Sequence, residues 1–306
     1  MAEQRWWKSA PDVDQRHIGA LIVGHITRDL LPDGGWRPGG AALYAGVTAR
    51  QLGMRPGIVT SAPPDLCVRA MEILGDVPMV AVPADEATTY ENIYTPTGRV
   101  QYVRARARTI SAADIPPFWR KCAVALLAPV AGEVAPSLAD SLHAPVIGAA
   151  PQGWLREWDA DGRVRPRDLT EDEAEALGRL SALVLSREDL TGPGADSATL
   201  AATSQTLAEW SRLVPSLVVT RGPEGADLWR AGVAERHPGC AVREVDPTGA
   251  GDVFAMSFVG ALGRGGEAGE AVDFANRVAA LSVEGEGHSA IPTPQQIAAR
   301  YPMSKE

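Results

Sequence analysis

The sequence predicts an α/β fold: a doubly wound, mostly parallel sheet with helices on both faces and a small β lid. Short apolar runs, beginning with Ala20–Gly24, alternate along the chain with segments of helical spacing. Polar residues such as Asp29 follow several of these runs, where open α/β sheets bind ligands. A chain of 306 residues with 45% hydrophobic content is large enough for such a core.

The predicted elements follow one another in α/β order, with each helix ending near a glycine or a polar loop. The predicted strands are 20–24, 57–60, 78–82, 122–128, 145–149, 182–186 and 216–220, with a further strand ending over 242–245. The predicted helices are 41–53, 65–74, 134–142, a short one from 171, 250–262 and 270–283. No internal repeat or low-complexity linker is visible, so residues 1–306 are expected to form one domain.

Two segments interrupt this alternation and predict the lid, at about 31–39 and 86–109. The first is rich in turn residues, and the second holds two β-rich runs around a turn at Thr95–Gly98. Three arginines at alternate positions predict one strand face, namely Arg104, Arg106 and Arg108. That face either reaches a substrate or γ-phosphate or is a solvated edge that discourages aggregation.

Composition excludes several classes of function. A net charge of −9 argues against nucleic-acid binding, and no apolar run is long enough to predict a membrane span. The first residues lack the apolar core of a signal peptide, and three scattered cysteines indicate reduced thiols, so we expect a cytoplasmic protein. Only three lysines occur and none follows a glycine-rich loop, which excludes a Walker-type P-loop and a protein-kinase fold.

The string Asp246-Pro-Thr-Gly-Ala-Gly-Asp252 carries the clearest chemistry in the chain. The amides of Gly249, Ala250 and Gly251 fall at a predicted helix N-terminus, which favours an anion. Asp252 places a carboxylate beside them. An anion site next to a base suits phosphoryl transfer, with the amides holding the phosphoryl group and Asp252 taking the hydroxyl proton.

This string resembles the second signature of the ribokinase-like (PfkB) carbohydrate kinases, Asp-Thr-x-Gly-Ala-Gly-Asp, with Pro247 between Asp246 and Thr248. The resemblance implies a ribokinase-like fold, an alcohol-phosphorylating kinase, and Asp252 as catalytic base. It also implies that Asp29, Gly39 and Gly40 bind substrate hydroxyls. Tyr44 stands near the position of a family asparagine, as in the inositol-kinase-like branch, and either lines the substrate pocket or is a core aromatic.

The resemblance extends to the ATP and metal sites. The loop with Thr220, Gly222 and Gly225 resembles the family's nucleotide loop, and Asn276 lies on the helix that packs against adenine. Ser186 and Asp189, with Glu188 beside it, stand in the place of the family's Asn-x-x-Glu motif and imply Mg²⁺ binding. Residues 284–289 resemble a loop that contributes to a monovalent-cation site. Gln152, Gly153 and Arg156 resemble a loop of the inositol-kinase-like branch.

These observations predict ATP-dependent phosphorylation of a small sugar or polyol, an inositol among them. A nucleoside kinase of the same fold is the second interpretation, with Tyr44 or Trp36 stacking on a base. A non-catalytic binding protein is the third, motivated by Ser186, Asp189 and Pro247. The resemblance implies a homodimer through the lid. The sequence does not identify the substrate, the hydroxyl that is phosphorylated or the oligomeric state. It also does not distinguish ATP from ADP as donor.

Overall fold

A computed structural model describes residues 17–95, 98–191 and 197–302 of the chain. Its centre is a nine-stranded sheet in the order β15-β14-β13-β12-β9-β8-β1-β4-β5, in which only β14 and β15 run antiparallel to their neighbours. The strands are β1 Ala20–Val23, β4 Pro56–Ala62, β5 Met79–Pro83, β8 Val124–Leu127, β9 Val146–Ala149, β12 Ala182–Ser186, β13 Ser216–Thr220, β14 Gly225–Arg230 and β15 Val233–Pro238. This architecture confirms the predicted α/β class.

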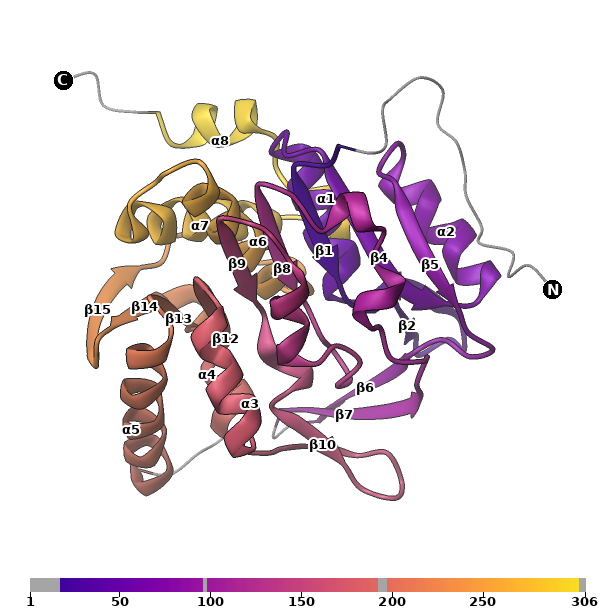
Figure 1. Cartoon of the computed structure of the whole chain (residues 1–306), viewed down its shortest axis with the longest axis horizontal. Coiled ribbons are helices and arrows are strands. Elements are labelled where there is room, and N and C mark those ends of the chain that lie inside the picture. The colour runs from indigo at the N-terminus through magenta and orange to yellow at the C-terminus, as the bar shows by residue number, and fades with distance from the viewer. Residues whose placement is uncertain (1–16, 96–97, 192–196, 303–306) are drawn as a thin grey trace.

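Helices cover both faces of the sheet because successive strand residues point to opposite sides (Figure 1). In β1, Ala20 and Ile22 join the core cluster under one set of helices, while Leu21 and Val23 join the cluster on the other face. The first face holds α1 Ala41–Gln51, α2 Pro64–Leu74, α6 Ala250–Gly263 and α7 Ala268–Ser282. The second holds α5 Ser197–Leu213 and the short turns η3 Pro136–Ser141 and η5 Leu177–Arg179.

The predicted lid is a separate four-stranded sheet in the order β3-β2-β6-β7. Its strands are β2 Thr27–Leu30, β3 Trp36–Gly39, β6 Thr89–Thr95 and β7 Gly98–Ala105. Figure 1 shows β2, β6 and β7 together beyond the end of β1, with β10 Arg156–Trp158 beside β7. β10 pairs with β11 Val164–Pro166. Residues 96–97, at the predicted turn between β6 and β7, lie outside the described residues.

The remaining helices are short: α3 Glu171–Ala176, α4 Arg187–Thr191 and α8 Pro294–Arg300. The other 3₁₀ turns are η1 Ala112–Asp114, η2 Pro117–Trp119, η4 Pro151–Gly153, η6 Gly222–Glu224 and η7 Gly287–Ala290. Within the ranges that the structure describes, no helix is long and apolar enough to cross a membrane.

Two sequence-based expectations about elements are wrong. The helix expected over 134–142 is only η3, because Val134 and His143 at its two ends pair with Ile110 and Lys121 in β-bridges. The strand expected to end over 242–245 is irregular backbone, and the amide of Val245 donates to the carbonyl of Val283 at 2.7 Å. The motif therefore follows a loop, and the sequence analysis missed the antiparallel pair β14–β15.

The three alternating arginines of the lid do not share a strand face. β7 ends at Ala105, so only Arg104 lies on it, where it pairs with Glu91 at 2.6 Å. Arg106 donates to the carbonyl of Gly132 at 2.9 Å, and the carbonyl of Arg108 contacts His25. The strand ends there because this segment turns back toward the central sheet.

Candidate active site

The predicted anion site lies at the start of α6 and is shaped by its glycines. Gly249 has φ +79°, the left-handed conformation that glycine adopts without strain. A Cβ built at Gly249 would lie 2.2 Å from the Tyr44 ring, so no larger residue fits this approach. A Cβ at Gly251 meets nothing within 4 Å, which leaves the space over the turn open.

Asp246 organises the loop that precedes this turn. Its Oδ1 accepts the amide of Thr248 at 2.9 Å, and its Oδ2 accepts the amide of Gly287 at 3.1 Å. The amide of Ala250 donates to the carbonyl of Pro247 at 3.2 Å and closes the turn. These bonds hold the loop on both sides of Pro247. They also engage Ala250, one of the three amides predicted to face an anion.

Asp252 lies in the first turn of α6 and is half-buried. Burial, followed by the nearby carboxylate of Asp189, raises the pKa of Asp252 to about 7. Arg156 opposes this rise in pKa, and Asp29 adds a smaller contribution to it. A general base works best when its pKa lies near the operating pH, so this environment suits proton abstraction.

A cavity of about 250 Å³ lies beside the motif, between the β13–β14 loop and α7. All four residues predicted to bind nucleotide line it, namely Thr220, Gly222, Gly225 and Asn276. Much of the remaining lining is apolar, and Ala250 and Gly251 of the motif border it. Gly225 has φ +94°, and a Cβ there would lie 2.2 Å from the carbonyl of His237. The predicted nucleotide residues and anion turn thus share one cavity.

The predicted substrate residues meet where the lid joins the sheet. Asp29 on β2 accepts a hydrogen bond from Thr27 Oγ1 at 2.8 Å. A Cβ at Gly39 would lie 2.2 Å from Asp29 Oδ2, and Gly40 has φ +90°. Both glycines are therefore required for the close approach of β3 to the Asp29 carboxylate and of the α1 N-terminus to β2.

Arg37 is a site residue that the sequence analysis missed. It pairs with Asp29 in the β2–β3 register, and its guanidinium lies 3.8 Å from Asp246 Oδ2 and 3.5 Å from Thr248 Oγ1. It thereby joins the lid to the motif across more than two hundred residues of sequence. The available signal was that Arg37 is the single basic residue of the segment 31–39.

The two aromatic residues considered for base stacking are already engaged. Tyr44 is buried against the Gly249 turn, and burial raises the pKa of its phenol above the usual range. Arg28 and Arg69 lie over the Trp36 ring, 4.4 and 4.0 Å from its centroid. Both rings are thus already in contact with protein groups.

Asp189, one of the two residues predicted to bind Mg²⁺, is engaged by protein groups in this structure. Asp189 Oδ2 accepts both the amide and the hydroxyl of Ser186 at 2.9 Å, and Oδ1 accepts from Arg156 at 3.0 Å. Glu188 points to solvent. Within the described part of the chain, no group of three metal-ligating side chains occurs. A carboxylate bound to an arginine and a helix cap does not fit a ready ligand for Mg²⁺.

Comparison with known proteins agrees with this geometry. The family model for pfkB family carbohydrate kinases matches residues 170–296. This range includes the β13–β14 loop beside the cavity, the motif and α7. Residues 170–296 are thus similar to the PfkB carbohydrate kinases. The resemblance of the chain's motifs to this family is thereby confirmed.

Curated relatives differ in the share of their length that aligns with this chain. The bifunctional protein HldE of Pseudomonas paraeruginosa is 39% identical over 35% of this chain and 23% of its own length. The ATP-dependent ribose-1-phosphate kinase of Halopiger xanaduensis is 35% identical over 27% and 28%. The chain thus spans about a quarter of these two relatives. The inositol 3-kinase of Zea mays is 29% identical over 90% of this chain and 74% of its own length.

Solved structures share the fold of this chain. A pyrophosphate-dependent kinase in the ribokinase family, complexed with a pyrophosphate analog and myo-inositol, has a TM-score of 0.73 at 17% identity, covering 89% of this chain and 98% of that one. Ribokinase from Thermotoga maritima has a TM-score of 0.68 at 21% identity, covering 92% and 98%. The predicted ribokinase-like fold is confirmed.

Proposed function

We propose that this protein transfers the γ-phosphoryl group of ATP to a hydroxyl of a small sugar or polyol, with Asp252 as general base. The observation that carries the proposal is the position of Asp252. It lies at the N-terminus of α6, between a cavity suited to a nucleotide and the lid carboxylate Asp29. Donor and acceptor would meet at this carboxylate.

In the proposed reaction, Asp29 accepts hydrogen bonds from acceptor hydroxyls and orients one of them toward Asp252. Asp252 removes the proton of that hydroxyl as its oxygen attacks the γ-phosphorus. The open turn at Gly249 and Gly251, at the positive end of α6, stabilises charge on the transferring phosphoryl group. Arg37, half-exposed beside Thr248, adds positive charge on the lid side.

The cavity supports ATP as donor. Several structural neighbours are pyrophosphate-dependent kinases, and pyrophosphate needs only charged or polar contacts. Here, Val242, Phe254, Ala280 and Val283 provide an apolar lining next to the motif. An apolar cavity stabilises a flat base and offers nothing to a bare inorganic anion.

An inositol-like polyol is the acceptor that the site supports best. An inositol 3-kinase aligns along 90% of this chain at 29% identity, against a cytidine kinase along 81% at 23%, and one structural neighbour is complexed with myo-inositol. A carboxylate such as Asp29 binds vicinal hydroxyls through its two oxygens. Nucleosides are less well supported, because Trp36 and Tyr44 are already packed against protein groups.

Substitution of Asp252 tests the assignment. In a coupled assay with myo-inositol, ribose and cytidine, we expect the wild type to turn over a polyol with ATP. Asp252→Asn should lower kcat by about 10²–10⁴-fold, the usual loss for a general base, while the KM for ATP stays within about twofold. Asp76→Asn, at an exposed position remote from the site, is the matched control. Near-normal turnover by Asp252→Asn would refute the role of this carboxylate.

A further inference from the structure

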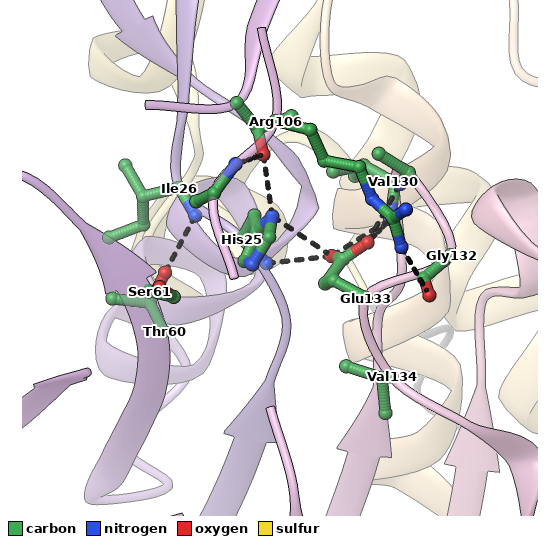
Figure 2. Close-up of polar contacts among 12 residues, drawn as sticks. His25, Ile26, Thr60, Ser61, Arg106, Val130, Gly132, Glu133 and Val134 are labelled. Carbon is green, nitrogen blue, oxygen red and sulfur yellow. Dashed lines mark hydrogen bonds and ion pairs between the residues drawn. The ribbon is translucent and has the colours of Figure 1, made fainter. Parts of the chain in front are cut away.

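His25 and Glu133 are two fully buried titratable residues that the proposed reaction does not use. They follow the adjacent parallel strands β1 and β8, at the edge of the central sheet where the lid begins. Figure 2 shows the two side chains side by side, with lid and sheet segments converging on them. Burial of both groups implies that protein partners replace their hydration.

Glu133 holds the loop that follows β8. Its carboxylate accepts the amides of Val130 at 3.0 Å, Ala131 at 2.7 Å and His25 at 2.9 Å. We call residues 130–133 the lid socket. One carboxylate thus binds amides of the segment after β8 and of His25, which lies between β1 and β2. It therefore fixes the lid socket to the start of β2.

The His25 ring binds both legs of the β6–β7 hairpin. Its Nε2 lies 2.9 Å from the carbonyl of Arg108, which can only accept, so Nε2 carries a proton. In the neutral tautomer Nδ1 then accepts from Thr88 Oγ1 at 2.7 Å, and Thr88 Oγ1 accepts the amide of Ala107 at 3.0 Å. The His25 ring and the Thr88 hydroxyl thus connect the segment before β6 to the segment after β7 at the base of the hairpin.

Three more bonds run from the lid to the socket. The Tyr90 hydroxyl donates to the carbonyl of Val130, and Arg106 donates to the carbonyl of Gly132 at 2.9 Å, which Figure 2 shows. The amide of Ile110 donates to the carbonyl of Glu133 at 2.8 Å. These bonds form a localised polar cluster at the base of the lid, in addition to the contacts of Arg37 with the motif.

This cluster is directly connected to the acceptor side of the site. Tyr90 is the partner of Asp29 in the β2–β6 register. A Cβ at Gly40 would lie 2.6 Å from the carbonyl of His25, so the His25 backbone also borders the turn that precedes α1. The donor cavity, by contrast, has no lining residue in the cluster.

We propose that His25, supported by Glu133, is a positioning residue that holds the lid and its Asp29 carboxylate at the correct distance from Asp252. The proposal rests on the proposed function for its kinetic part. It assigns the buried polar cluster to acceptor binding rather than to donor binding or to general stability. Loss of one of the two hydrogen bonds of the His25 ring should therefore increase the mobility of the lid and leave the rest of the sheet unchanged.

Conservative variants can remove the two hydrogen bonds of the His25 ring, to Thr88 and to the carbonyl of Arg108, separately. Asn at position 25 keeps a polar group near Nδ1 for Thr88 and loses the Arg108 carbonyl, whereas Gln reaches the Arg108 carbonyl and loses Thr88. Thr88→Val removes the hydroxyl at nearly constant volume. His143→Gln, at an exposed histidine, is the matched control.

Two readouts decide the proposal: hydrogen exchange of the lid and the KM values for acceptor and ATP. The first does not require catalysis. We expect faster exchange in residues 88–95 and 98–108 of His25→Asn, His25→Gln and Thr88→Val, with β12 and β13 unchanged. The acceptor KM should rise by about fivefold or more, the usual effect of one lost hydrogen bond, while the KM for ATP stays within about twofold.

Three outcomes would overturn it: unchanged exchange in the lid, equally faster exchange in β12 and β13, or equal increases in both KM values. If the wild type phosphorylates no acceptor, the proposed function fails, and lid exchange alone decides whether His25 holds the lid.

Discussion

The environment of Asp252 determines the pH range over which the proposed reaction can run. Burial and the negative charge of Asp189 both disfavour its ionised form, and its pKa rises to about 7. A general base must be ionised before the proton transfer. The active fraction therefore grows as the pH increases through 7, in the direction opposite to that expected for a catalytic acid.

We predict that kcat/KM for the acceptor falls about tenfold for each pH unit below roughly 6 and becomes constant above roughly 8. The measurement is a pH profile under conditions where the proton-transfer step limits the rate. A profile that stays level down to pH 5 would show that Asp252 is ionised at its ordinary pKa, or that another group is the base.

At the scale of single residues, the sequence predicts what is local to a motif and misses what depends on packing. Gly249 and Asp252 follow from the motif string because their roles depend on the turn they form. The contact of Tyr44 with Gly249 and the reach of Arg37 to Asp246 depend on how α1 and β3 dock against α6. The spacing of residues contains no information about that docking.

At the scale of elements, α4 shows how a motif position can acquire a different role. Ser186 precedes this five-residue helix, and its hydroxyl accepts the amide of Asp189 at 3.2 Å while Asp189 accepts from Ser186 in return. This reciprocal arrangement is a capping box. The salt bridge to Arg156, with 11% and 7% exposed side chains, engages the other oxygen of Asp189.

We therefore predict that Asp189→Asn leaves metal binding nearly unchanged. Mn²⁺ titration of the protein, followed by electron paramagnetic resonance, should give a Kd within about twofold of wild type. The variant should also lower the melting temperature, because the Arg156 guanidinium loses its charged partner in a poorly solvated position. Glu188→Gln, next to it in sequence and exposed, is the control. A Kd weakened tenfold or more would instead identify Asp189 as a metal ligand.

The two wrong predictions of secondary structure have a common physical reason. Residues 134–142 have helical spacing, but both ends pair with distant segments through Ile110 and Lys121. The segment 242–245 has β propensity, but the amides of Val245 and Asp246 donate to the carbonyl of Val283. Long-range pairing overrides local propensity in both cases. The long periodic helices α1, α6 and α7 were predicted nearly to their ends.

At the scale of the whole molecule, the proposed donor and acceptor sites lie apart along the carboxyl edge of the central sheet. The acceptor residue Asp29 belongs to the lid that extends from β1, and the donor cavity lies at β13, β14 and α7. The sequence predicts this arrangement because parallel strands bring their polar ends to one edge. The cavity itself was not predictable, since part of its lining comes from the irregular loop 239–244.

Filling the cavity tests this separation. Ala280 lies on α7 and lines the donor cavity, so Ala280→Trp should occupy the space of a base. We expect the KM for ATP to rise about tenfold or more, which corresponds to roughly 1.4 kcal/mol, while the acceptor KM stays within about twofold. The stabilisation of the protein by ADP in thermal unfolding should decline in parallel. Ala299→Trp, on the exposed face of α8, controls for the effect of a large side chain. An unchanged KM for ATP in Ala280→Trp would exclude the cavity as the base site.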